Sequence, residues 1–225
     1  DVREKSDSEL VKEVEKIGIK IYWSHTVVDT YGYKRLKEIT IMPLSKDGMS
    51  VVEKKINMKC NCLAIAGGWT PAVHLFTQSG GKLKFREEDQ VFLPNISQSK
   101  QISIGSCNGD FKLNEIIKNL LLNVKNFLEI ENTEYDSLKI ECPSDNVKKN
   151  IWLLPSDKVI GKTKPFVDFQ NDATAKDIKL ALREGFRSIE HVKRYTTTGM
   201  GTDQGKLGNM HALGIIADTA GVKMG

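Results

Sequence analysis

The chain has 225 residues, enough to bury one good hydrophobic core or two small ones. Its apolar content of 40%, charged content of 28% and net charge of +4 are those of a globular protein and exclude a strongly basic nucleic-acid-binding chain. Four scattered cysteines exclude a secreted disulfide scaffold, and the sequence shows no signal peptide and no apolar run long enough to span a membrane, so a cytoplasmic location is predicted.

The first quarter of the chain predicts a helix followed by a meander of strands. Apolar residues on one face indicate an amphipathic helix over residues 8–17. Alternation of apolar and polar residues then indicates strands at residues 19–23, 26–30, 35–42 and 49–56. This order is typical of the end of a nucleotide-binding domain, although any small α+β unit would also produce it.

A further buried strand is predicted at residues 62–66, directly before Gly67 and Gly68. A buried strand that ends in paired glycines is the usual way to bring a backbone close to a bound dinucleotide. The signal is weak by itself, because a tight turn needs glycines just as often.

The cysteines and the histidine of this region do not indicate a metal or catalytic site. Cys60 and Cys62 have no second Cys/His cluster at ligand spacing, so they are interpreted as small hydrophobic residues at a buried strand. His74 stands among apolar neighbours and is expected to be packed.

Residues 101–110 predict a strand that ends in a turn of small residues, and residues 113–128 predict a helix with a wide core-facing side. Such a turn directs backbone N–H groups toward an anion. The turn is therefore a candidate anion site, while a plain connection between strand and helix stays open.

A polar segment, residues 132–158, predicts a linker with a local apolar anchor at 151–154. Beyond it, Asp172 and Thr174 are candidate caps of a helix, and Ser188 is the candidate cap of a second. The apolar stripe of the first helix is Ile178, Ala181 and Leu182, and Gly185 is expected to close it.

A turn rich in threonine and glycine follows at residues 196–201, and a last helix is predicted at residues 203–220. The turn is flanked by Lys193, Arg194 and Lys206. Free backbone N–H groups beside cations suit an anion or phosphate. Composition alone favours an interhelical turn with a solvated basic rim.

Several longer runs resemble one known family. FVDFQND, TAKDI, REGFRSIEHVKRYTT and GMGTDQGK in the last third, and GGWTPAVHLFTQSGGKL earlier, resemble the alpha subunit of heterotetrameric sarcosine oxidase. The resemblance implies an α/β chain: the C-terminal part of a two-dinucleotide-binding-domain (FAD/NAD(P)-type) fold at 1–130, a linker at 131–164, and a small helical domain at 165–225. The chain lacks an initiator methionine and ends in a glycine-rich stretch, so we expect an internal fragment of that subunit.

The helical domain also resembles bacterioferritin-associated ferredoxin, in which four cysteines hold a [2Fe–2S] cluster. The corresponding places here are Asp168, Gln170, Asp203 and Gly208. Clusters of this kind are normally held by thiolates, so the resemblance implies a ferredoxin-like frame without an iron–sulfur cluster.

The family resemblance further implies a subunit of an enzyme that oxidises sarcosine to glycine and hydrogen peroxide and passes the one-carbon unit to tetrahydrofolate. In that family the alpha subunit holds NAD, FMN lies at the interface with the beta subunit, FAD and tetrahydrofolate bind elsewhere, and gamma and delta subunits complete the assembly. No catalytic residue, metal site, nucleic acid or membrane contact is expected in this chain. The candidate cofactor-binding residues are Gly67, Gly68, Asn108, Gly109, Leu113, Lys193, Arg194, Thr196 and Thr197.

Two alternatives stay open. One is a subunit like those of opine oxidase or hydrogen cyanide synthase, which share the layout but keep the cluster cysteines. The other is a non-catalytic docking module with a vestigial nucleotide site.

Overall fold

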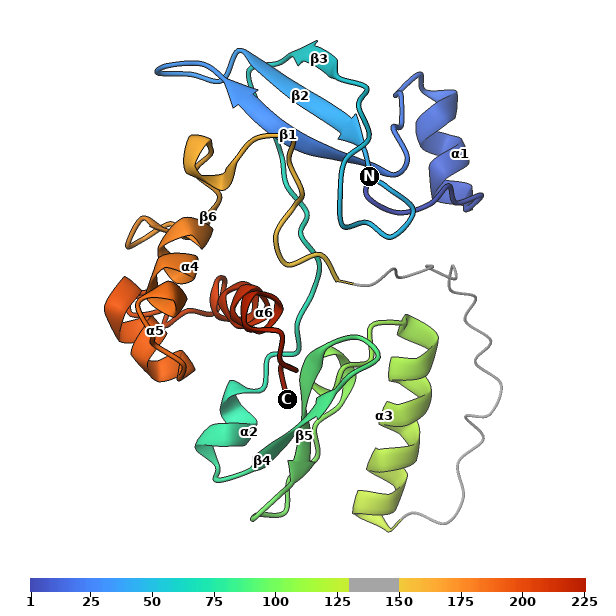
Figure 1. Cartoon of the computed structure of the whole chain (residues 1–225). Coiled ribbons are helices and arrows are strands. Elements are labelled where there is room, and N and C mark those ends of the chain that lie inside the picture. Colours follow the sequence, from blue (N-terminus) through green and yellow to red (C-terminus); the bar gives the residue numbers. More distant parts are fainter. Residues whose placement is uncertain (130–149) are drawn as a thin grey trace. The chain divides into compact units, whose positions relative to one another are not determined.

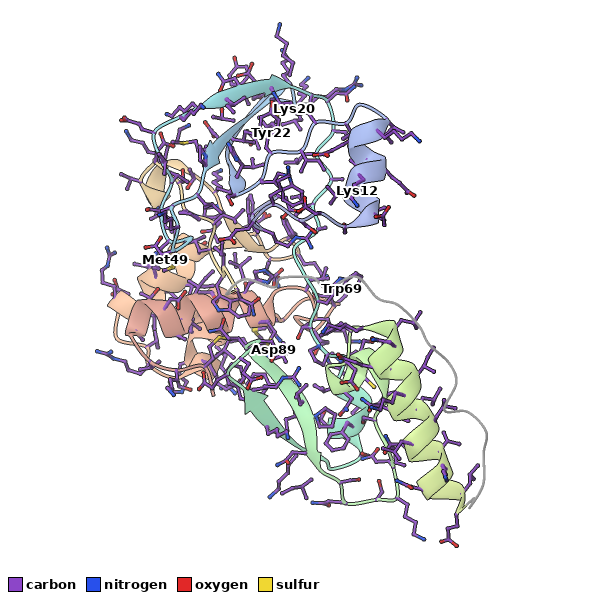
Figure 2. The ribbon with its side chains drawn as sticks, turned by 90° about the vertical axis from the view of Figure 1, so that its right-hand side faces the viewer. Lys12, Lys20, Tyr22, Met49, Trp69 and Asp89 are labelled. Atoms are coloured by element: carbon purple, nitrogen blue, oxygen red, sulfur yellow. The ribbon has the colours of Figure 1, made fainter. Side chains whose placement is uncertain are left out.

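The computed structural model describes residues 1–129 and 150–225 (Figure 1), and Figure 2 draws the side chains of this part of the chain. The described residues group into two compact units, residues 1–64 with 150–224, and residues 65–129 with Gly225. These units do not coincide with the predicted domains 1–130, 131–164 and 165–225, whose independent folding stays a prediction. Each unit is described by itself.

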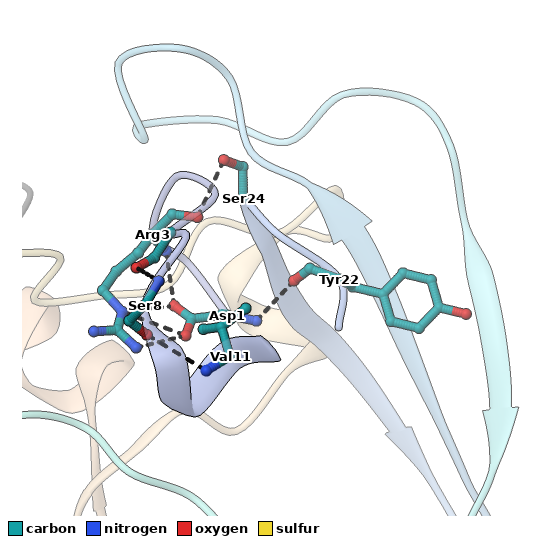
Figure 3. Close-up of polar contacts among 7 residues, drawn as sticks. Asp1, Arg3, Ser8, Val11, Tyr22 and Ser24 are labelled. Atoms are coloured by element: carbon teal, nitrogen blue, oxygen red, sulfur yellow. Dashed lines mark hydrogen bonds and ion pairs between the residues drawn. The ribbon is translucent and has the colours of Figure 1, made fainter. Parts of the chain in front are cut away.

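The first unit begins with the predicted amphipathic helix, α1 (Glu9–Lys16). Its N-cap is Ser8, whose hydroxyl accepts a hydrogen bond from the Val11 N–H (Figure 3). The apolar face is only partly covered, because Val11 and Val14 are half-buried, no residue of the helix is buried and Leu10 is 68% exposed. The pattern predicted the helix correctly.

A three-stranded antiparallel sheet follows, in the order β1 (His25–Tyr31), β2 (Glu38–Pro43), β3 (Ile56–Lys59). The sheet buries Val28, Ile39, Ile41 and Met42. The strands predicted at 26–30 and 35–42 are confirmed.

Two other strand predictions in this unit are wrong. Residues 19–23 form no strand, since no described strand lies beside them; Tyr22 offers its carbonyl to the Asp1 ammonium group instead (Figure 3). The strand predicted at 49–56 is reduced to one bridge between Leu44 and Val51, and the paired strand β3 begins only at Ile56. A strand forms only where a neighbouring strand pairs with its backbone N–H and C=O groups. The alternation of apolar and polar residues does not show whether such a neighbour is present.

The C-terminal part of the first unit is helical. It contains β6 (Phe166–Asp168), β7 (Ala173–Thr174), α4 (Ala175–Arg183), α5 (Ile189–Thr196) and α6 (Asn209–Ala220), after a short 3-10 turn at Ile160–Lys162. Trp152 and Leu153 pack against its core, which confirms the predicted apolar anchor. The core consists of Ala175, Ile178, Ala181, Val192, Ala212, Ile215 and Ile216.

The limits of α4 follow from its sequence. Thr174 and Asp177 form a capping box, in which the Thr174 hydroxyl accepts from the Asp177 N–H and the Asp177 carboxylate accepts from the Thr174 N–H. At the other end Gly185 has a φ of +98°, and the Gly185 and Phe186 N–H groups bond the Leu182 and Ala181 carbonyls. This is a Schellman motif, which requires a left-handed residue and explains the glycine.

The last helix begins later than predicted, at Asn209 instead of residue 203. Residues 203–208 form turns, because the Asp203 carboxylate accepts hydrogen bonds from the Gly205 and Leu207 N–H groups and Gly205 has a φ of +73°. Asp203 therefore organises a loop that opposes helix formation.

The second unit consists of α2 (His74–Gln78), an antiparallel hairpin of β4 (Lys82–Arg86) and β5 (Val91–Ile96), a 3-10 turn η1 (Gly105–Asn108) and α3 (Leu113–Leu128). The bounds of α3 match the prediction, but its expected core-facing side is wrong, since no residue of α3 is buried. The hairpin was not predicted.

Three further expectations for residues 60–104 are wrong. Residues 62–66 and 101–104 form no strands, and Ile65 is 81% exposed rather than buried. Cys62 was expected to lie in that buried strand and is exposed. His74 was expected to be packed and is exposed at the first turn of α2. Each of these segments needs a neighbouring strand or layer that the described residues do not provide.

Candidate functional site

Gly67 and Gly68 lie on an extended, exposed segment beside Trp69, which is 86% exposed (Figure 2). Gly68 has a φ of +111°, a conformation that favours glycine. A side-chain Cβ at either position would have no heavy atom of the described chain within 4 Å. The backbone is therefore accessible here, and contact with a dinucleotide stays a prediction.

The predicted anion turn is tightly built. Gly109 has a φ of +80°, and its carbonyl accepts a hydrogen bond from the Arg86 guanidinium at 3.3 Å. A Cβ on Gly109 would lie 2.5 Å from the Leu93 side chain. The Arg86 guanidinium is itself fixed by two hydrogen bonds to the Asp89 carboxylate. The β4–β5 hairpin thus supports the turn, and both glycine's conformation and its lack of a side chain are required at position 109.

Asp110 joins this turn to α3. Its N–H bonds the Gly105 carbonyl at 3.2 Å, and its carboxylate accepts from the Asn119 amide at 3.1 Å. The Asn108 amide reaches the same carboxylate at 3.5 Å, at the limit of a hydrogen bond. Leu113, at the first turn of α3, is 54% exposed, and no side chain caps this helix. The structure therefore brings Asn108, Gly109 and Leu113 to one turn with an uncapped helix start.

In the helical part of the first unit, Asp168 connects two loops. Its carboxylate is almost fully buried and accepts from the N–H groups of Gln170 (2.8 Å), Asn171 (3.1 Å) and Gly199 (2.7 Å), and from the Asn171 amide (3.2 Å). Burial alone would raise the pKa of Asp168, but the hydrogen bonds from Gly199, Asn171 and Gln170 outweigh it and hold the pKa below its ordinary value. The Asp168 carboxylate therefore accepts four hydrogen bonds and holds the two loops together.

The other places of the resembled cluster lie in the same loops. Gln170 accepts from the N–H and the hydroxyl of Thr202, both at 2.7 Å. Gly208 lies so close to Val167 that a Cβ would stand 2.5 Å from the Val167 carbonyl oxygen. In the described part of the chain no group of three or more His, Cys, Asp or Glu side chains could hold a metal ion.

The threonine turn divides into inward and outward residues. The Thr196 hydroxyl is buried, donates to the Val192 carbonyl at 2.8 Å and is bonded to the Thr198 hydroxyl at 2.8 Å. Thr197 adopts a φ of +58° and ends α5. The Thr196 hydroxyl therefore makes its hydrogen bonds inside the fold. Lys193 and Arg194, which precede it on α5, form no ion pair with a described residue.

Two groups that hold these loops were not predicted from the sequence. Asn171 donates to both the Asp168 carboxylate and the Thr197 carbonyl, the latter at 3.1 Å. Arg86 and Asp89 support the Gly109 turn. The polar tip Glu87–Gln90 between two alternating segments was the available signal for the hairpin that contains this pair.

The fold belongs to a mixed α/β class that includes a solved dehydrogenase. The chain matches the crystal structure of L-proline dehydrogenase from P. horikoshii with a TM-score of 0.57 and 18% identity, over 99% of this chain and 44% of that one. At this identity the likeness shows the fold alone. The ferredoxin-like detail of residues 165–225 stays a prediction.

Residues 162–225 match the family described as the Sarcosine oxidase A3 domain. The sarcosine oxidase subunit alpha of Rhizobium meliloti (strain 1021) is 32% identical over 213 residues, 87% of this chain and 20% of that protein. The subunit of the same name from Corynebacterium sp. (strain P-1) is 28% identical over 92% of this chain and 22% of its own length. The predicted resemblance to the alpha subunit of sarcosine oxidase is therefore confirmed, and the chain spans about a fifth of these relatives.

No helix within residues 1–129 and 150–225 is long and apolar enough to cross a membrane.

Proposed function

We propose that the chain is part of the alpha subunit of a cytoplasmic sarcosine oxidase, which oxidises sarcosine to glycine with formation of hydrogen peroxide and 5,10-methylenetetrahydrofolate. The observation behind this proposal is the similarity to sarcosine oxidase alpha subunits over most of the chain, together with the A3 domain match. In this proposal the chain contributes binding and positioning of cofactors and has no catalytic side chain of its own.

The proposed NAD contacts are Asn108, Gly109 and Leu113, with Gly67 and Gly68 as additional backbone contacts. The turn suits a pyrophosphate, because it leads into α3, whose N-terminus has no side-chain cap. NAD would supply an anionic dinucleotide here, and the residues of the turn would hold and orient it.

The proposed contacts with FMN and the beta subunit are Lys193, Arg194 and Thr197, with Thr196 supporting them from inside. Cations without ion-pair partners suit a phosphate, and the buried Thr196 hydroxyl fixes the end of α5 on which they stand. FMN would supply electron transfer with the beta subunit. FAD, tetrahydrofolate and the gamma and delta subunits belong elsewhere in the proposed assembly, which contains no iron–sulfur cluster.

The experiment is cofactor extraction from the purified complex containing this chain, co-expressed with the proteins encoded beside it. We expect NAD and flavin to be released, and sarcosine-dependent peroxide to form. Asn108→Ala should lower the NAD content, whereas Asn123→Ala, on α3 away from the turn, should not. Equal NAD content in both variants would refute the assignment of the turn.

A further inference from the structure

Residues 152–160, which lie within the predicted linker, contact two different parts of the first unit (Figure 1, gold). One part is the antiparallel sheet of β1, β2 and β3, and the other is the helical core formed by α4, α5 and α6. We name this segment the strap. Its contacts with the sheet and its contacts with the helices are of different physical kinds.

The helical side of the strap is apolar. Trp152, Leu153 and Ile160 pack against the helical core. The Trp152 ring approaches α6 so closely that a Cβ on the buried Gly214 would lie 2.2 Å from it. The same ring contacts the His211 ring edge to face, with centroids 5.9 Å apart. Contacts of this kind depend on buried apolar surface, and salt does not screen them.

The sheet side of the strap is polar and begins at a β-bulge. β1 is an outer strand of the sheet, and its register against β2 shifts between Val27 and Asp29, which leaves Val28 without a partner on β2. The Ser156 hydroxyl donates a hydrogen bond to the Val28 carbonyl at 3.4 Å. The bulge therefore presents a backbone acceptor on the edge of the sheet, and the strap uses it.

Two ion pairs of opposite polarity follow this hydrogen bond. The Asp157 carboxylate pairs at 2.5 Å with the ammonium group of Lys55, which directly precedes β3, and Lys158 pairs with the Asp29 carboxylate on β1. Because β1 and β3 are the outer strands, the strap is joined to both edges of the sheet. Between 28% and 53% of each of these four side chains is exposed, so both ion pairs are weak and screened by salt.

We propose that the strap is a hinge between the sheet and the helical part, whose polar side opens while its apolar side stays closed. Opening of the polar side breaks only solvent-screened contacts, whereas release of the apolar side would empty the space that Trp152 fills over Gly214. Higher ionic strength therefore favours the open hinge, in which the sheet changes its orientation relative to the helical part. The proposal does not depend on the proposed function.

The test is hydrogen–deuterium exchange, read by mass spectrometry, on the purified complex that contains this chain. Lys158→Glu should raise the exchange rate of residues 151–160 about two- to fivefold, because it replaces an exposed ion pair with two facing carboxylates. Asp29→Lys should have a similar effect, and the double variant should restore the wild-type rate because its ion pair is rebuilt with reversed charges. The matched control is Lys12→Glu, which breaks the exposed ion pair with Glu9 on α1 and should leave residues 151–160 unchanged.

Ionic strength and α6 distinguish the two sides of the hinge. Added salt should raise the exchange rate of residues 151–160 in the wild-type protein, and should raise it less in Lys158→Glu, where salt also screens a repulsion. Residues 209–220 of α6 should keep their rate in both cases, whereas Trp152→Ala should raise it.

Three results would overturn the proposal. The first is an unchanged rate of residues 151–160 in Lys158→Glu and Asp29→Lys, and the second is a double variant that does not restore the wild-type rate. The third is an equal rise in residues 151–160 and 209–220 on adding salt, because the two sides would then open together.

Discussion

At the residue scale, the main feature is the buried carboxylate of Asp168. Asp168 receives N–H groups from its own loop and from Gly199 of the opposite loop, so a single side chain holds both loops together. The negative charge is compensated by backbone and amide dipoles rather than by a cation. The Asp168 hydrogen bonds therefore hold the two loops together.

Replacing Asp168 with Asn should destabilise the protein at neutral pH. The amide NH₂ would face N–H donors in place of one carboxylate oxygen, and leaving such buried donors unpaired costs about 1–3 kcal/mol. Urea unfolding at pH 7 measures this loss. Asp172→Asn is the control, because Asp172 is exposed and should change the unfolding free energy by less than about 0.5 kcal/mol. Equal values for the two variants would contradict the anchor role.

The same variant should alter the dependence of stability on pH. The pKa of Asp168 lies below its ordinary value in the folded protein, so its stabilisation is complete above the unfolded pKa of about 3.9 and is lost as the pH falls through the folded pKa. Between about pH 5 and the acid limit, the unfolding free energy of the wild-type protein should therefore fall more steeply than that of Asp168→Asn. Parallel curves would show that Asp168 does not titrate with folding.

At the element scale, helices were predicted well because their signals are local. The N-terminal limits of α1 and α4 follow from the side-chain caps Ser8 and Thr174, and the bounds of α3 match its apolar periodicity. Helix α5 begins directly after Ser188, as predicted, although the Ser188 side chain does not cap it. Strands were predicted less well, since alternation does not show which segment will pair. Residues 19–23 and 62–66 have the pattern but no neighbouring strand, whereas the unpredicted β4 and β5 have each other.

The two N-caps allow a matched comparison. Thr174→Ala removes the half of the capping box in which the Thr174 hydroxyl accepts from the Asp177 N–H, and should lower the unfolding free energy by about 1 kcal/mol, up to about 2 kcal/mol. Ser188→Ala should cost less, because the Ser188 side chain makes no capping hydrogen bond. Thermal unfolding of the two variants measures the difference. A greater loss for Ser188→Ala would contradict the assigned cap geometry.

At the scale of the whole molecule, the cofactor contacts at Asn108, Gly109 and Leu113 stay predictions. The three residues lie between the end of η1 and the start of α3 because they are close in the sequence. The supporting pair Arg86 and Asp89 was not predictable from spacing, because it depends on the hairpin. Likewise, the composition of residues 196–201 could not show that the Thr196 hydroxyl faces inward.

The basic end of α5 gives a prediction for the assembled complex. Lys193→Glu with Arg194→Glu should lower its FMN content, because both changes place negative charge where a phosphate is proposed. Lys176→Glu with Lys179→Glu on α4 makes the same charge change elsewhere. Flavin released per complex is the readout, and equal FMN in both double variants would remove Lys193 and Arg194 from the proposed site.

The most direct test of the proposed function is the visible absorption spectrum of the purified complex before and after addition of sarcosine under anaerobic conditions. We predict flavin bands that bleach on addition of sarcosine, with no thiolate–sulfide bands of an iron–sulfur cluster. Flavin bands that sarcosine leaves unchanged would contradict the substrate. Thiolate–sulfide bands assigned to this chain would contradict the cluster-free Asp168 site and favour the opine-oxidase-like alternative.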